Sequence, residues 1–270
     1  MEEIKVHALV LREAPMGDKD KRLVLLTAEL GKISVLAKGA LGAKSRFKAI
    51  SGSFSYGEYV LSKGNTFYYI KEGTLLESFY GLRTNLNRLS YAAYMCEAAE
   101  TFSLEGQENR ELLRLLLRGL QAEEKAEKGM ESVAADVMVF RMLAENGFYP
   151  ELGVCRQEGY RDDKKHDLSK PVLFFPGNGN ILCAECANAS FLNPTGNENA
   201  SYQGGVWLSS GARAALSYCI SQPLSKAFSF KVNEEVRVQI HEAVSRYLQF
   251  QTDHVYKSLT FLNRIDGSFT

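Results

Sequence analysis

The first eighty residues contain five short β-type runs separated by glycine-containing turns, and this pattern restricts the fold more than any other feature of the chain. The runs are Val6–Leu11, Lys32–Ala37, Phe54–Leu61, Thr66–Ile70 and Thr74–Phe79. The segment 18–30 is typical of a short helix, or of mixed strand and helix, that ends at Gly31. Five short strands in this length predict a small closed or partly open barrel of the OB type. An SH3-like barrel fits nearly as well, and the sequence does not separate the two.

A basic stretch without acidic residues lies within this barrel region. No Asp or Glu occurs between Leu30 and Gly57. The cations of the stretch are Lys32, Lys38, Lys44, Arg46 and Lys48. Cations pair with phosphates and aromatic faces stack on unpaired bases, so the stretch predicts a surface for single-stranded DNA, with Phe47 or Phe54 as the stacking ring. The competing interpretation is a solvated loop whose lysines contribute only solubility.

After Gly81 the sequence changes to helical periodicity. Helices are predicted at Leu86–Phe102, Arg110–Leu120, Val133–Glu145, Gly211–Gln222 and Asn233–Phe250. Residues 151–205 interrupt this pattern with many glycines, asparagines and prolines and few aliphatic residues. We therefore predict an α+β protein with an OB-fold domain at 1–80, a helical bundle made of 81–150 and 206–270, and an insertion at 151–205.

The cysteines of the insertion have the spacing of metal ligands. Cys183 and Cys186 form a CxxC pair that can reach one tetrahedral Zn²⁺, and Cys155 lies where the other knuckle of a zinc ribbon belongs. Glu158 occupies the position that would complete a second CxxC, so Glu158 and His166 are both candidates for the fourth ligand. We predict one zinc ion per chain, because the insertion has too few aliphatic residues to order itself. The alternatives are a metal-free loop and, without a surrounding βαβ pattern, a redox CxxC.

A row of arginines marks the second predicted helix. Arg110, Arg114 and Arg118 recur every four residues on one side of a leucine stripe. The stripe consists of Leu112, Leu113, Leu116, Leu117 and Leu120. A cationic rim beside an apolar groove can capture an acidic peptide that ends in a hydrophobic residue. The plainer interpretation is a solvated helix face.

The overall charge excludes a generic polyanion binder. The chain has 32 basic and 32 acidic residues, so any nucleic-acid site must be a local patch. Its start does not resemble a signal peptide, it has no apolar run long enough for a membrane span, and its five unevenly spaced cysteines do not suggest a disulfide framework. We therefore expect a cytoplasmic protein.

No motif marks an enzyme. The segment Gly39–Ser45 resembles a phosphate-binding loop, but Ala43 stands in place of the second glycine and the loop is one residue short. We identify no Ser–His–Asp or Cys–His arrangement. A metal hydrolase that uses residues 155–186 is disfavoured, because a closed thiolate site leaves no open position for water. We therefore expect a protein without catalytic activity.

The order of these parts, together with several short motifs, resembles the RecO family of bacterial recombination mediators. The motifs are Ala8-Leu-Val-Leu11, KRLVLLTAELGK ending at Lys32, Ala37-Lys-Gly-Ala40, Lys44-Ser-Arg46, Leu182-Cys183-x-x-Cys186, Ser245-Arg-Tyr-Leu248 and Lys257-Ser258-x-x-Phe261-Leu262. The match covers nearly the whole chain, and it depends on the order of motifs that are not diagnostic singly. The resemblance implies an OB fold, a helical bundle and a zinc-binding insertion that some members have lost. Glu158 departs from the family pattern, which has a cysteine there.

The resemblance also implies a function in DNA repair. Such proteins bind single-stranded DNA, anneal complementary strands and act with RecR to load RecA onto DNA coated with single-strand binding protein (SSB). The resemblance further implies a nucleoid-associated protein with a site for the SSB C-terminal tail in its helical region, for which the arginine row is our candidate. The alternative, from another class, is an adaptor whose zinc ribbon and barrel bind only proteins.

Overall fold

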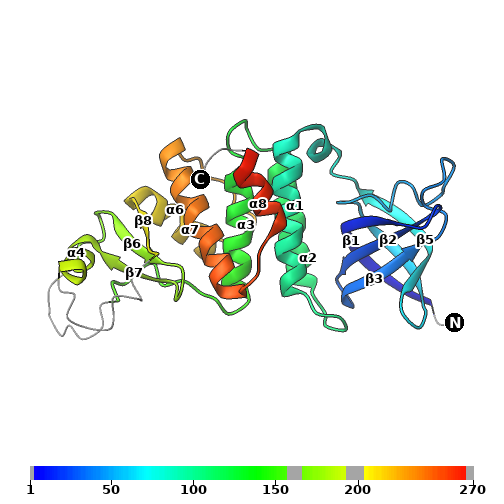
Figure 1. Cartoon of the computed structure of the whole chain (residues 1–270), viewed down its shortest axis with the longest axis horizontal. Coiled ribbons are helices and arrows are strands. Elements are labelled where there is room, and N and C mark those ends of the chain that lie inside the picture. Colours follow the sequence, from blue (N-terminus) through cyan, green and yellow to red (C-terminus); the bar gives the residue numbers. More distant parts are fainter. Residues whose placement is uncertain (1–2, 157–165, 193–203, 266–270) are drawn as a thin grey trace. The chain divides into compact units, whose positions relative to one another are not determined.

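Five strands close into a barrel at the start of the chain (Figure 1). They are β1 (Glu3–Met16), β2 (Asp20–Thr27), β3 (Gly31–Ala37), β4 (Tyr56–Lys63) and β5 (Tyr68–Glu77), in the order β1-β2-β3-β5-β4. Strands β3 and β5 pair in parallel, and the other neighbours pair antiparallel. This closed five-stranded order is that of the OB fold, so the topology decides the choice between barrels that the sequence left open.

The structure, a computed structural model, describes residues 3–156, 166–192 and 204–265. By their contacts, the residues form two units, one made of 1–125 with 257–270 and the other of 126–256. The barrel belongs to the first unit. The sequence predicted three domains: a barrel, a helical bundle and an insertion. The contacts divide the chain differently, into two units, and group residues 257–270 with the barrel, so the division into three domains stays a prediction.

Alternating side chains explain the barrel core. Leu23 and Leu25 of β2 enter it together with Ile33 and Val35 of β3. The helix that the sequence allowed within 18–30 is therefore wrong, because Asp20–Thr27 is a strand. The two runs predicted at 66–70 and 74–79 are likewise one continuous strand, β5.

Helices complete the first unit. They are the 3₁₀ helix η1 (Tyr80–Thr84) and the α-helices α1 (Leu86–Phe102), α2 (Arg110–Glu124) and α8 (Lys257–Ile265). The turn between β2 and β3 touches the loop between α1 and α2, where a Cβ on Gly31 would lie 2.0 Å from the carbonyl oxygen of Leu104. Only glycine permits this close approach, and Gly31 also has a φ of +64°. The contact fixes the start of α2 against the barrel.

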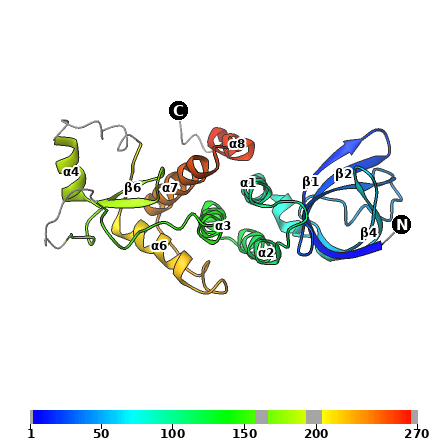
Figure 2. The same ribbon diagram turned by 90° about the horizontal axis from the view of Figure 1, so that it is seen from below.

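The second unit combines helices with a small sheet. Its helices are α3 (Glu131–Glu145), α4 (Ala184–Leu192), α6 (Ser210–Ser221) and α7 (Glu234–Thr252), and its strands are β6 (Val172–Phe175), β7 (Asn180–Cys183) and β8 (Val206–Leu208). Figure 2 shows α3, α6 and α7 of this unit from below. The sheet has the order β7-β6-β8, so it extends past residue 205, where we placed the end of the insertion.

A buried polar pair joins two helices of the second unit. The Nδ1 atom of His241 on α7 lies 3.0 Å from a carboxylate oxygen of Asp136 on α3, and both side chains are buried. Asn233 caps α7 as its sequence position predicts, by accepting a hydrogen bond from the N–H of Val236. Within the described residues, no helix is both long and apolar enough to cross a membrane.

Candidate metal centre and cationic surfaces

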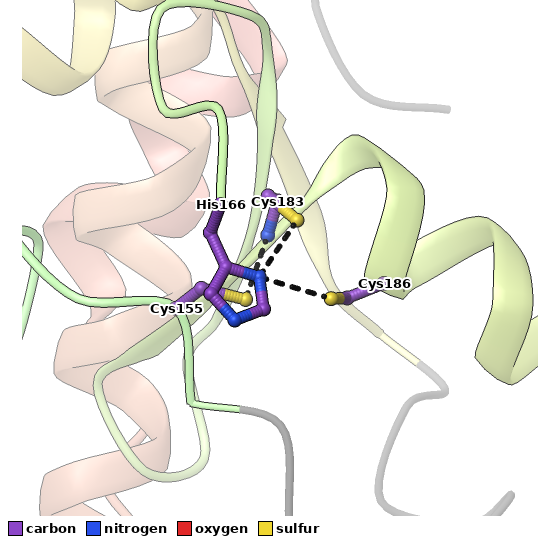
Figure 3. A group of neighbouring side chains, drawn as sticks. All are labelled: Cys155, His166, Cys183 and Cys186. Carbon is purple, nitrogen blue, oxygen red and sulfur yellow. Dashed lines mark hydrogen bonds between the residues drawn. The ribbon is translucent and has the colours of Figure 1, made fainter. Parts of the chain in front are cut away.

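Four possible metal ligands converge in the second unit (Figure 3). Cys183 is the last residue of β7, and Cys186 lies in the first turn of α4. Cys155 lies beside β7, where it forms a parallel β-bridge with Ile181. The Nδ1 atom of His166 is 3.6 Å from the sulfur of Cys183 and 3.4 Å from that of Cys186. One ligand atom from each of Cys155, His166, Cys183 and Cys186 lies within 4.8 Å of the others.

These separations fit one tetrahedral ion. Zn–S bonds of about 2.3 Å and a Zn–N bond of about 2.0 Å place sulfur and nitrogen about 3.5 Å apart around a tetrahedral zinc. The distances of 3.6 Å and 3.4 Å from the His166 nitrogen to the sulfurs of Cys183 and Cys186 lie on either side of that value. The cluster thus offers three thiols and one imidazole in a suitable arrangement for a metal ion.

The protonation of the thiols differs because their surroundings differ. Burial opposes ionisation of Cys183, but hydrogen bonds from the Cys186 N–H and from His166 outweigh it and lower the pKa of the Cys183 thiol. Burial is the main cause that raises the pKa of Cys155, and burial together with hydrogen bonding to the other thiols raises that of Cys186. A metal ion would bind these cysteines as thiolates, so binding would release their protons.

One arginine holds the two loop segments that supply ligands. Arg213 of α6 donates a hydrogen bond of 3.1 Å to the carbonyl of Leu152 and another of 3.0 Å to the carbonyl of Leu168. Leu152 precedes Cys155 by three residues, and Leu168 follows His166 by two. The sequence contains no local signal for this contact, because Arg213 lies in a different segment of the chain.

The structure narrows the choice of the fourth ligand. The sequence left this position open between His166 and Glu158, and the structure places His166 beside the three cysteines. Glu158 lies outside the described residues. A small apolar core supports the cluster, so the insertion buries more than its composition suggested. This core includes Leu173, Phe175, Leu182 and Ala187.

The predicted cations of the barrel lie at its surface, with one exception. Lys38, Lys44, Arg46 and Lys48 are exposed. Within the described part of the chain, none of these four forms an ion pair, so their charges are available to a ligand. Lys32 differs, because it is half-buried and its ammonium donates a 2.9 Å hydrogen bond to the carbonyl of Glu100 on α1.

The two rings that we predicted to stack on bases are not accessible. Phe47 belongs to the barrel core and is 6% exposed, and Phe54 is 3% exposed. Phe47 contributes only through its contact with Arg46, whose guanidinium carbon lies 4.7 Å from the ring centroid. The prediction that Phe47 or Phe54 stacks on bases is therefore wrong for this structure, because the 38–55 segment turns both rings inward.

Two rings that the sequence reasoning missed do reach the outer surface of the barrel. Phe67 and Tyr69 are half-buried, and each lies under a cation. The guanidinium of Arg22 is 5.5 Å from the centroid of Phe67, and the ammonium of Lys38 is 5.0 Å from the centroid of Tyr69. The alternation of the TFYYI run was the available signal, since Tyr68 and Ile70 enter the core and leave Phe67 and Tyr69 on the outer side.

The arginine row of α2 lies at a pocket of about 490 Å³ within the first unit. Its lining includes Arg110, Arg114, Arg118, Leu113 and Leu117 from α2, and His7, Tyr56 and Phe79 from the barrel side. Arg110 and Arg114 form exposed ion pairs with Glu108 and Glu111, at 3.1 Å and 3.3 Å. Such pairs contribute little to stability, so an acidic ligand can replace them.

A neutral phenol forms part of the wall of this pocket. Burial, and then the carboxylates of Glu29 and Glu58, raise the pKa of the Tyr56 hydroxyl. The pocket therefore combines apolar and neutral aromatic walls with a row of guanidinium groups on one side, and the carboxylate of Glu77 also lines it. An apolar group that carries carboxylates matches the α2 side of this lining, where the leucines and the guanidinium groups lie.

Comparison with known proteins gives matches over nearly the whole chain. A family model described as "Recombination protein O N terminal" matches residues 1–79, and one described as "Recombination protein O C terminal" matches residues 83–260. The DNA repair protein RecO of Acetivibrio thermocellus is 30% identical over 266 residues, which cover 98% of each chain.

Other relatives have the same name. The DNA repair protein RecO of Alkaliphilus metalliredigens is 29% identical over 97% of this chain and 99% of its own length. That of Desulforudis audaxviator is 34% identical over 69% of this chain and 71% of its own. The residues matched by the two family models, 1–79 and 83–260, include the barrel and the four residues of the candidate metal centre. The chain therefore belongs to the RecO family of DNA repair proteins.

Proposed function

We propose that this protein binds single-stranded DNA through its barrel, anneals complementary strands, and acts with RecR to load RecA onto DNA coated with SSB. The observation that supports this most is the set of four exposed cations on an OB barrel, Lys38, Lys44, Arg46 and Lys48, which form no ion pair with any residue that the structure describes. An OB barrel with a cationic surface is a common platform for single strands. The protein performs this function without catalysing a reaction.

Charge neutralisation explains how binding promotes annealing. Two single strands repel each other through their phosphates, and lysines or arginines that pair with phosphates release counterions and reduce this repulsion. Lys44 and Arg46 lie in the glycine-containing 38–55 segment, whose backbone can follow the path of a DNA strand. Bases of a strand held by its phosphates remain free to pair with a second strand.

We infer that the metal of the insertion is zinc and that its role is structural. Cys155, His166, Cys183 and Cys186 supply four protein ligands, which is the full coordination of a structural zinc site. A closed set leaves no position for a reacting water. When bound, the ion would hold the segment of Cys155, the end of β7 and the start of α4 together.

We further propose that the pocket at α2 receives the C-terminal tail of SSB. Binding of an acidic tail with an apolar end requires an apolar notch, and it requires cations at the rim that keep the carboxylates paired. Leu113 and Leu117 supply the notch, and the guanidinium groups of Arg110, Arg114 and Arg118 supply the rim. The pocket and the basic stretch are separate sets of residues, so substitutions can test the two sites independently.

An annealing assay tests the proposed function. Two complementary oligonucleotides that carry a donor and an acceptor dye should anneal faster with the protein than without it. The double variant Lys44→Glu/Arg46→Glu should lose most of this acceleration, because it reverses two charges of the DNA surface. An adaptor that binds only proteins would accelerate annealing in neither form, and this result would reject the proposal.

A further inference from the structure

The outer face of the barrel carries two aromatic rings, those of Phe67 and Tyr69, which lie two residues apart in the sequence. Phe67 and Tyr69 alternate with Tyr68 and Ile70, whose side chains belong to the barrel core. In the sheet, Tyr69 pairs with Leu36 of β3, and Leu36 pairs with Arg22 of β2. Arg22, Leu36 and Tyr69 therefore form one row across three strands, with Phe67 on the same face.

Cations cover these rings in the free protein. Arg22 lies over Phe67 at 5.5 Å and Lys38 lies over Tyr69 at 5.0 Å. Among the described residues neither cation has an acidic partner, and the only side-chain hydrogen bond of either is a 3.5 Å contact from Arg22 to the hydroxyl of Ser34. The two charges are therefore held near the rings by weak contacts that a phosphate can replace.

The turn before β5 is built to accommodate the Tyr69 ring. A Cβ on Gly64 would lie 2.5 Å from Cε2 of Tyr69, so the ring packs against a position that has no side chain. The N–H of Gly64 donates a 3.0 Å hydrogen bond to the carbonyl of Phe67, which closes the turn that carries both rings. The platform thus has a packed base, with exposed cations above it that are held only by weak contacts.

We propose that Phe67 and Tyr69 are the base-stacking platform of this protein, and that Arg22 and Lys38 move from the rings to the phosphates when a single strand binds. This inference rests on the proposed function and names the residues that stack on the bases of single-stranded DNA. Two bases of the strand take the ring faces that the cations leave. Each exchange keeps the cation paired and replaces an exposed cation–π contact by base stacking, which is the stronger interaction.

The platform also explains a preference for single strands. The faces of bases in a duplex are covered by their neighbours in the stack, whereas a single strand can present them to a protein ring. The cations alone would bind both forms, because both carry phosphates. The rings therefore supply the discrimination and the cations supply the salt-dependent affinity.

The test uses an oligonucleotide of mixed sequence and a matched oligonucleotide with abasic sites, which keeps the phosphates and removes the bases. Binding of the full chain is measured by fluorescence anisotropy at several salt concentrations. Phe67→Leu and Tyr69→Leu keep apolar packing but remove the ring faces. Tyr80→Leu is the control, because Tyr80 is an exposed aromatic residue of the same unit, 68% exposed, away from these cations.

We expect each ring variant to bind the normal oligonucleotide about tenfold more weakly with an unchanged salt slope, and Tyr80→Leu to bind as the wild type. The double variant Phe67→Leu/Tyr69→Leu should bind the normal and the abasic oligonucleotide equally weakly. The wild type should bind the abasic oligonucleotide with this same weak affinity. Equal, salt-dependent binding of both oligonucleotides by the wild type would overturn the platform while the proposed DNA binding stands. Binding of neither oligonucleotide would overturn both.

Discussion

The guanidinium of Arg213 lies 3.0 Å from the carbonyl oxygen of Leu168, on the segment that carries His166. The same guanidinium is 3.1 Å from the carbonyl of Leu152, on the segment that carries Cys155. A helix that is remote in sequence thus connects the two segments that carry candidate metal ligands. Contacts of this kind orient ligands without touching the ion.

Replacement of Arg213 should weaken metal retention. Arg213→Met removes both hydrogen bonds and leaves all four ligands in place, so we expect zinc to be lost to a chelator at a concentration about tenfold lower. The control is Arg156→Met, since Arg156 follows the candidate ligand Cys155 directly but pairs with Glu151 at the exposed surface. Equal retention by the two variants would contradict a positioning role for Arg213.

Metal analysis should distinguish the two candidates for the fourth ligand. Protein purified without chelator should contain about one zinc per chain. His166→Ala should reduce this content strongly, because the imidazole faces two of the thiols. Glu158→Gln should leave the content unchanged. The opposite pattern would assign the fourth position to Glu158.

Charge reversal in the barrel loop should change the salt dependence of DNA binding. Lys44→Glu/Arg46→Glu removes two phosphate contacts, and each contact to a single strand contributes about 0.7 to the slope of log K against log salt. We therefore expect the slope to decrease in magnitude by about 1.4, with weaker binding at low salt. A folded double variant with the slope and affinity of the wild type would remove these residues from the DNA surface.

The pocket and the DNA surface should respond to different substitutions. Arg114→Glu places a negative charge on the rim, so it should weaken binding of an SSB tail peptide at least tenfold and leave binding of bare single-stranded DNA nearly intact. Lys125→Glu, a charge reversal at the end of α2 outside the pocket lining, is the control. A parallel loss of peptide and DNA binding in Arg114→Glu would place α2 on the path of the DNA, and no loss of either would make the row a solvated face.

Alkaline pH should destabilise the second unit through Cys219. Burial raises the pKa of this thiol from 9.0 to about 12. Above pH 9 the unfolded chain therefore releases a proton that the folded chain keeps, and the free energy of unfolding decreases as the pH rises toward 12. Between pH 9 and 10.5 the loss from this group reaches about 2 kcal/mol. Urea unfolding at the two pH values should show a smaller loss in Cys219→Ala, and an identical loss would refute the assignment.

The sequence predicted the barrel but misread one of its strands. The predicted number of strands agrees with the structure only because two errors cancel: the sequence leaves β2 open between helix and strand, and the runs predicted at 66–70 and 74–79 are one strand, β5. Val24 and Leu26 face outward on β2, yet both are buried, so the strand lacks the alternation of apolar and polar residues that a half-exposed strand shows. Helix α8 was missed because its docking depends on Glu97 of α1, which accepts hydrogen bonds from the N–H groups of Lys257 and Ser258.

The sequence predicted which residue types form the candidate sites better than it predicted how their side chains are arranged. The spacing of Cys155, Cys183 and Cys186 indicated a metal site, but only the fold brings His166 to it. Charge in the 30–57 stretch indicated a cationic surface, but burial of Phe47 depends on how that segment packs into the barrel. Whether a ring points inward or outward in an irregular segment is set by tertiary packing, which a one-dimensional pattern does not contain.

Binding of labelled oligonucleotides, measured by fluorescence anisotropy over a series of salt concentrations, tests the central claim most directly. The protein should bind a single strand more tightly than a duplex of the same length, and its affinity for the single strand should fall steeply as salt increases. Affinity for neither form, or an affinity independent of salt, would contradict the account of the barrel as a single-strand DNA surface.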